Sequence, residues 1–141
     1  MRKELVDTLY ERYPAIFAEF QRPDAEENGY KIWCKDGWFE LINTLCEQLQ
    51  YWAFTRKTPQ PIAMDVKEKF GALRFVAQNE NAEQRGAIRM AQTMSTRLCE
   101  VCGAPGRLIV DGCTIMTRCE QHTHEGAILV EENERREYMI C

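Results

Sequence analysis

The stretch Cys99–His122 reads CEVCGAPGRLIVDGCTIMTRCEQH, and it decides how the C-terminal part of the chain folds. It begins with Cys99 and Cys102 and ends with Cys119 and His122, and two residues separate the members of each pair. This spacing lets the backbone curl so that both side chains of a pair face one ion. Thiolate sulfur and imidazole nitrogen are the usual ligands of tetrahedral structural zinc. We therefore predict that these four residues bind one structural zinc ion.

The segment between the two pairs has the pattern of a β-hairpin. Residues Arg107–Val110 and Cys113–Thr117 are rich in β-branched and apolar side chains, and Asp111-Gly112 between them is a strong turn signal. Gly103 suits a tight turn directly after the second thiolate, where positive φ is common. A knuckle, a hairpin and a second ligand pair, in this order, are typical of treble-clef and zinc-ribbon modules.

Two alternatives for the metal ligands remain open. His124 lies two residues beyond His122 and offers a second imidazole for the fourth position, although the spacing favours His122. Cys113 lies inside the hairpin, where we predict a small buried side chain rather than a ligand. The remaining cysteines have no partner at ligand spacing: Cys34, Cys46 and Cys141. Cys46 borders an apolar helix face and is predicted to be in the core.

The sequence does not predict an enzyme. A site with four protein ligands is closed and has no position for a catalytic water. Both histidines of the chain, His122 and His124, lie beside the predicted metal, so acid–base catalysis by histidine is hard to build. No Gly-rich phosphate loop, nucleophile elbow or HExxH motif is present.

Upstream of the metal motif, apolar spacing predicts three helices. The first covers Lys3–Phe20 with a break at Pro14, and the second covers Gly37–Phe54 with Asp36 as its N-cap. The third contains Ile88 and ends near Leu98. A short extended piece is expected around Ile32. Alternation over Ile62–Val66 and Leu73–Val76, with Gly71 between, predicts a hairpin whose turn lies within Lys69–Ala72.

These elements together predict an α+β fold. Residues 1–98 would form a helical region with a β-hairpin, and residues 99–141 a zinc-binding module followed by a charged tail, packed as one unit. The run 131–137 (EENERRE) is expected to be a helix or a frayed tail.

Composition limits where the protein acts and what it binds. The chain has 141 residues, seven cysteines and a formal charge of −4. The N-terminus lacks the apolar core of a secretion signal and no stretch is long enough to span a membrane, so a cytoplasmic location and metal rather than disulfide chemistry are expected. A net negative charge argues against general nucleic-acid binding.

The predicted upstream hairpin carries the candidate partner-binding residues. Lys67, Lys69 and Arg74 alternate with aromatic residues, a pattern that can bind single-stranded nucleic acid by stacking and phosphate contact. The alternative is a solvated hairpin whose other face packs into the core. Of the three tryptophans, Trp33 is expected to be exposed and available to a partner, while Trp38 and Trp52 are expected in the core.

Three motifs carry a resemblance to a known group of proteins. KEKFGALRF (Lys67–Phe75), CEVCGAPG (Cys99–Gly106) and CEQH (Cys119–His122) resemble segments of small bacteriophage and prophage proteins. The resemblance implies an accessory protein that binds a host protein in the host cytoplasm, and one version is an inhibitor of a bacterial defence system. The chain after His122 is longer than the pattern requires. A nucleic-acid-binding zinc protein that acts as a regulator is the alternative.

Overall fold

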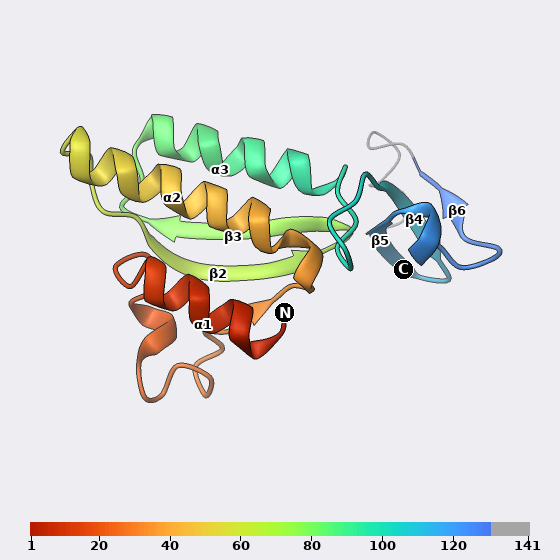
Figure 1. Cartoon of the computed structure of the whole chain (residues 1–141), viewed down its shortest axis with the longest axis horizontal. Helices are drawn as coiled ribbons and strands as arrows, with labels where there is room; N and C mark the ends of the chain where they lie inside the picture. Colours follow the sequence, from red (N-terminus) through yellow and green to blue (C-terminus); the bar gives the residue numbers. More distant parts are fainter. Residues whose placement is uncertain (131–141) are drawn as a thin grey trace.

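Three α-helices and two three-stranded sheets form the part of the chain that the computed structural model describes, residues 1–130. The predicted α+β class is therefore confirmed. Figure 1 shows the helices and the first sheet at one end of an elongated molecule and the second sheet at the other. No helix among the described residues is long and apolar enough to cross a membrane.

The first sheet has the order β1-β2-β3 and is covered by helices on one face. Strand β1 (Ile32–Trp33) runs parallel to β2 (Ile62–Lys69), which pairs antiparallel with β3 (Ala72–Gln78). Side chains alternate along β2 and β3, so Val66, Leu73 and Phe75 are buried on the covered face. Helices α1 (Lys3–Arg12), α2 (Phe39–Thr55) and α3 (Ala82–Ser95) contribute the other apolar side chains of this core, among them Leu9, Ile42, Leu45, Cys46, Leu49, Ile88 and Ala91.

The helix boundaries differ from the sequence predictions for local reasons. Helix α1 ends at Arg12, two residues before Pro14, as the predicted break requires. Asp36 does not cap α2: its carboxylate accepts a hydrogen bond from the backbone N–H of Arg2 instead, and it lies in the short 3₁₀ helix η2 (Asp36–Trp38). Helix α3 begins at a capping box formed by Asn81 and Gln84, which the sequence analysis missed.

The predicted burial of several side chains is confirmed, with two exceptions, Trp52 and Cys113. Trp38 and Cys46 are fully buried, and Trp33 is 61% exposed, as expected. Trp52 is only half-buried, with the guanidinium of Arg56 against its ring. Cys113 is exposed at the tip of the second hairpin, so the prediction of a buried side chain there was wrong.

The second sheet has the order β5-β4-β6. Strands β4 (Arg107–Asp111) and β5 (Thr114–Arg118) form the predicted hairpin, while β6 (Ile128–Leu129) had not been predicted. A small apolar cluster lies beneath it: Leu108, Val110, Ile115 and Val130. The predicted helix or tail at 131–137, and Cys141, lie outside the described residues.

The turn between β2 and β3 connects the two sheets. Phe70 and Gly71 both have positive φ, 52° and 76°, which makes this a two-residue turn of the type favoured in hairpins. A left-handed aromatic residue costs about 1 kcal/mol, and here the Phe70 ring packs against the apolar cluster of the second sheet. The buried hydroxyl of Thr117 donates a 2.6 Å hydrogen bond to the Gly71 carbonyl oxygen. The hairpin tip is thus an internal contact between the two parts of the chain.

Candidate metal centre

The first pair of ligands lies in a knuckle that follows α3. The N–H of Gly103 donates to the Cys99 carbonyl oxygen, and the N–H of Cys99 donates to the Ala104 carbonyl oxygen, both at 2.8 Å. Gly103 has φ +79°, which confirms the tight turn expected there. The two backbone bonds close the loop and place the thiols of Cys99 and Cys102 on the same side.

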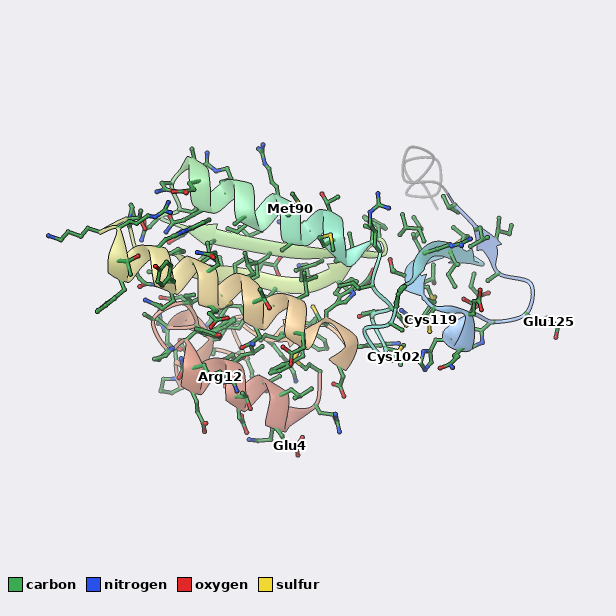
Figure 2. The ribbon with its side chains drawn as sticks, turned by 45° about the horizontal axis from the view of Figure 1, so that its top comes forward. Glu4, Arg12, Met90, Cys102, Cys119 and Glu125 are labelled. Atoms are coloured by element: carbon green, nitrogen blue, oxygen red, sulfur yellow. The ribbon has the colours of Figure 1, made fainter. Side chains whose placement is uncertain are left out.

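The second pair lies where β5 passes into the short 3₁₀ helix η3 (Glu120–His122). The N–H of His122 donates to the Cys119 carbonyl oxygen at 3.0 Å, and the hydroxyl of Thr123 donates to the same oxygen at 2.8 Å. This single turn brings His122 back toward the Cys119 side chain. Figure 2 shows Cys102 and Cys119 close together between the first sheet and the second.

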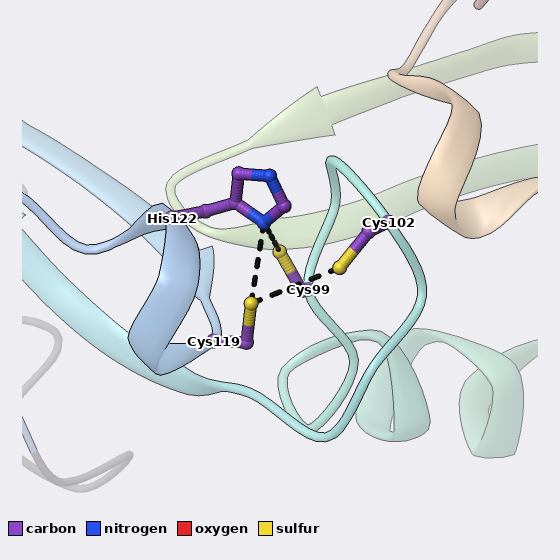
Figure 3. A group of neighbouring side chains, drawn as sticks. All are labelled: Cys99, Cys102, Cys119 and His122. Carbon is purple, nitrogen blue, oxygen red and sulfur yellow. Dashed lines mark hydrogen bonds between the residues drawn. The ribbon is translucent and has the colours of Figure 1, made fainter.

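The four predicted ligands converge on one point, as Figure 3 shows. Their ligand atoms all lie within 4.8 Å of one another. The His122 Nδ1 atom is 3.2 Å from the sulfur of Cys119 and 3.6 Å from that of Cys99, while the sulfurs of Cys102 and Cys119 are 3.7 Å apart. The cluster is therefore able to hold a metal ion, with the imidazole offering Nδ1.

The environment of Cys99 favours the thiolate that a metal requires. Burial alone acts to raise the pKa of this thiol, but backbone N–H groups of Cys102, Cys119 and Val101 point at the sulfur and outweigh it. Together with the Cys102 side chain they lower the pKa of Cys99 to about 6. Cys102, by contrast, is exposed, so one edge of the cluster faces solvent.

The alternatives among the ligands are decided by position. His124 is exposed and is not part of the cluster that the described residues form, so His122 is the histidine of this arrangement. Cys113 is also outside the cluster, as expected, despite its unexpected exposure. Cys34 is buried beside β1, where burial raises the pKa of its thiol.

A buried ion pair between Glu100 and Arg118 connects the Cys99–Cys102 loop to the rest of the chain. The sequence did not predict this pair. The Glu100 carboxylate accepts hydrogen bonds from the backbone N–H of Lys35 and from Nη1 of Arg118, both at 3.1 Å. Its carbonyl oxygen accepts from the N–H of Gly37 at 2.8 Å. Glu100 is the residue inside the first CxxC pair, so it ties the metal knuckle to β5 and to the segment before α2. The one sequence feature that pointed to this pair is the charged Glu100 between Cys99 and Cys102.

The knuckle also depends on a close approach to Gly37. A Cβ atom at this position would lie 2.5 Å and 2.7 Å from the backbone nitrogens of Gly103 and Cys102. Next to it, Nε1 of the buried Trp38 donates to the Leu98 carbonyl oxygen at 2.9 Å. The start of α2 and the metal knuckle therefore fit together only through a residue without a side chain.

The four candidate partner-binding residues share the other face of the first sheet. Trp33 on β1 pairs with Lys67 on β2, which pairs with Arg74 on β3, so the three form one row across the sheet. Lys69 lies two residues beyond Lys67 and points to the same side. We call these four residues the open face, because the helices that bury Val66 and Phe75 cover the opposite face.

The charges on the open face are partly compensated. One carboxylate oxygen of Asp65 lies 2.9 Å from the Lys67 ammonium and 2.8 Å from Nε of Arg74. The Lys31 ammonium lies over the Trp33 ring, 5.0 Å from its centre. Lys69 stacks in the same way on Phe70 at 5.5 Å. The predicted grouping of Lys67, Lys69 and Arg74 is confirmed, but the row carries less net positive charge than the sequence suggests.

Comparison with known proteins does not extend this description: no family model, no curated protein and no solved structure matches the chain. The candidate metal cluster and the open face are therefore the features that bear on function.

Proposed function

We propose that the cluster of Cys99, Cys102, Cys119 and His122 binds zinc in a structural role. A tetrahedral zinc ion with bonds of about 2.3 Å to sulfur and about 2.0 Å to nitrogen separates neighbouring sulfurs by about 3.7 Å, and sulfur from nitrogen by about 3.5 Å. The Cys102–Cys119 separation of 3.7 Å and the Cys99–His122 separation of 3.6 Å are close to those values, while the Cys119–His122 separation of 3.2 Å is shorter. Three thiolates and one imidazole are a set that zinc occupies in folded modules.

We further infer that the protein is a non-enzymatic binding protein whose target is another protein. A site with four protein ligands keeps no open coordination position, which supports a structural rather than a catalytic metal. In the phage-type version of this proposal, the target is a host protein in the bacterial cytoplasm, for example a component of a defence system. The resemblance of the three sequence motifs supports that version.

The observation that carries the binding proposal is the row Trp33–Lys67–Arg74 on the open face. Tryptophan and arginine dominate the energetics of protein interfaces, and here both extend from rigid strands in fixed register. Trp33 is 61% exposed although the other two tryptophans are at least half-buried. Exposing so large an apolar side chain costs solvation free energy that a partner would recover.

Nucleic-acid binding is the second candidate, because aromatic and basic side chains on an open sheet also suit single strands. Two contacts weigh against it. The Lys31 ammonium occupies one face of the Trp33 ring, and Asp65 compensates Lys67 and Arg74. The net charge of −4 adds long-range repulsion for phosphates.

Affinity purification of the tagged full chain from its native host, with mass spectrometry, tests the proposal. We expect one host protein in stoichiometric amounts. Its recovery should fall strongly with Trp33→Ala and with Lys67→Ala/Arg74→Ala. The control is Phe54→Ala, which removes an aromatic side chain that is 85% exposed on α2, away from the open face.

The same preparation distinguishes the second candidate. Submicromolar binding of DNA or RNA that weakens as salt rises, and that disappears in Lys67→Ala/Lys69→Ala/Arg74→Ala, would replace the leading proposal. A partner retained equally by the open-face variants and by Phe54→Ala would show that another surface binds it.

A further inference from the structure

A groove between β3 and α3 continues from the edge of the open face. Its volume is about 590 Å³, and strand residues Lys69, Ala72, Arg74 and Val76 line one side of it. The other side is formed by α3, with Arg89, Gln92 and Thr93. We call this the cationic groove, because three positively charged side chains reach it and none of the described residues that line it has a carboxylate.

The polar groups in the cationic groove are almost all hydrogen-bond donors. Arg89 is exposed and its guanidinium makes no ion pair or hydrogen bond within the described residues. The side-chain oxygen of Gln92 accepts from the N–H of Phe75, so its NH₂ group is the part left to face a ligand. The Arg74 guanidinium is already paired with Asp65, so the Arg89 guanidinium is the group that an anion would meet. Guanidinium groups suit carboxylates in a two-point geometry.

The groove does not accept an added β-strand. Backbone N–H groups on the outer edge of β3 already have hydrogen-bond acceptors on α3. Ser95 Oγ accepts from the N–H of Leu73 at 2.7 Å, and the Gln92 side-chain oxygen accepts from the N–H of Phe75 at 3.2 Å. A ligand must therefore be recognised through its side chains, with the apolar Ala72 and Val76 beneath it.

The aromatic contacts decide between an acidic peptide and a nucleic acid. Phe70 is the one aromatic ring among the described residues that line the groove. Lys69 lies over this ring, and the ring packs against the apolar cluster of the second sheet. Bases would find no free aromatic surface for stacking, which single-strand binding uses. Carboxylates need only the donors that are present.

We propose that the cationic groove binds an acidic peptide segment of the partner protein, with Arg89 as the residue that pairs with its carboxylates. This inference rests on the proposed function: the open face contacts the body of the partner, and the groove takes a segment rich in Asp or Glu beside it. Arg89 was not among the residues singled out from the sequence.

A titration of the isotope-labelled full chain with a fluorescein-labelled decapeptide of glutamate tests the proposal. At low salt we expect backbone amide shifts in the NMR spectrum to concentrate on Ala72, Val76, Arg89 and Thr93. Fluorescence anisotropy should show about threefold weaker binding for Arg89→Gln, the size of one exposed ion pair, and about tenfold weaker binding for Arg89→Glu.

The matched control is Arg12→Glu, which makes the same change of charge on α1. Figure 2 shows Arg12 on the opposite side of the molecule from α3, and its side chain donates to the neutral Asn43. Arg12→Glu should leave peptide binding within a factor of two. Equal losses for Arg12→Glu and Arg89→Glu would reduce the effect to net charge and overturn the proposal.

Other outcomes also overturn it: no salt-dependent binding of the peptide, shifts that map elsewhere, or tighter binding of a thymidine decanucleotide than of the peptide. The two levels of the argument can fail separately. A host partner lost with Trp33→Ala but unaffected by Arg89→Glu would leave the proposed function intact and refute the groove. If peptide binding depends on Arg89 but recovery of the partner is insensitive to Trp33→Ala, the groove proposal stands and the role of the open face is refuted.

Discussion

Gly37 lies so close to Cys99 that a Cβ atom on the glycine would overlap the cysteine's carbonyl oxygen. The glycine belongs to the short helix η2 before α2, and the cysteine is the first residue of the candidate metal cluster, more than 60 positions later in the chain. The metal knuckle is therefore built against the helical part of the protein and is not an independent appendage.

Gly37→Ala should destabilise the protein by about 3 kcal/mol, because the added methyl group meets backbone atoms that cannot move aside cheaply. It should also speed zinc release to a chromogenic chelator. Thermal and chelator assays measure both effects. Gly86→Ala is the matched control: this glycine lies within α3 with open space around it, so we expect a gain of up to about 1 kcal/mol. A stable, zinc-retaining Gly37→Ala protein would contradict the close fit.

Untreated protein should contain one zinc ion per chain by elemental analysis, and Cys102→Ser should lose it. Structural zinc contributes on the order of 10 kcal/mol to folding in small modules, so the region after Leu98 should unfold in this variant. Cys113→Ser and His124→Ala should keep their zinc, because neither side chain belongs to the cluster. Iron in place of zinc, or equal loss from Cys102→Ser and Cys113→Ser, would show that the ligand set is wrong.

Thr117→Val should cost about 1–2 kcal/mol of unfolding free energy. The substitution keeps the shape of the side chain but leaves the buried Gly71 carbonyl without the 2.6 Å bond that the hydroxyl donates. Chemical denaturation measures the change. Thr114→Val on the same strand is exposed and should change stability by less than about 0.5 kcal/mol. If the two variants behave alike, the hairpin tip does not hold the two sheets together.

Glu100→Gln should destabilise the protein by about 3 kcal/mol. Arg118 has only 8% of its side chain exposed, and without the carboxylate its guanidinium is a buried, uncompensated charge. Denaturation at neutral pH tests this, with the exposed neighbour Glu120→Gln as the control. Glu100→Gln/Arg118→Met should recover part of the loss. A double variant less stable than Glu100→Gln would argue that the ion pair is not the cause.

The Asp65 carboxyl predicts an acid-sensitive contribution to stability. Its partial burial acts to raise its pKa, but hydrogen bonds from Lys67 and Arg74 outweigh this and lower the pKa below its ordinary value. A carboxyl group whose pKa is lower in the folded than in the unfolded state stabilises the folded protein at pH values above its unfolded-state pKa. This contribution is lost as pH falls through the folded-state pKa. Asp65→Asn should therefore cost up to about 1 kcal/mol at pH 5–7, and the difference from wild type should shrink below about pH 4. A difference that does not change with pH would exclude this linkage.

Local pattern alone was enough to predict the four residues that form the candidate metal cluster and most helices and strands. Two pairs at fixed spacing around an Asp-Gly turn are short-range features, and so are the helix periodicity of α2 and the alternation of β2 and β3. Backbone geometry couples residues two to four positions apart, so these features survive without knowledge of the rest of the fold. The same two-residue period places Lys67 and Lys69 on one face of the strand.

The tertiary structure decided what depends on contacts between distant segments. The sequence predicts Asp36 as a helix N-cap, but its carboxylate accepts a hydrogen bond from the backbone N–H of Arg2. The Glu100 side chain is buried because Arg118 and the backbone N–H of Lys35 donate hydrogen bonds to its carboxylate. The sequence predicts a charged hairpin at KEKFGALRF, either solvated or partner-binding, but not that its Phe70-Gly71 tip contacts the second sheet. Burial and long-range hydrogen bonds arise from packing over many residues, and neither composition nor spacing encodes which partners will meet.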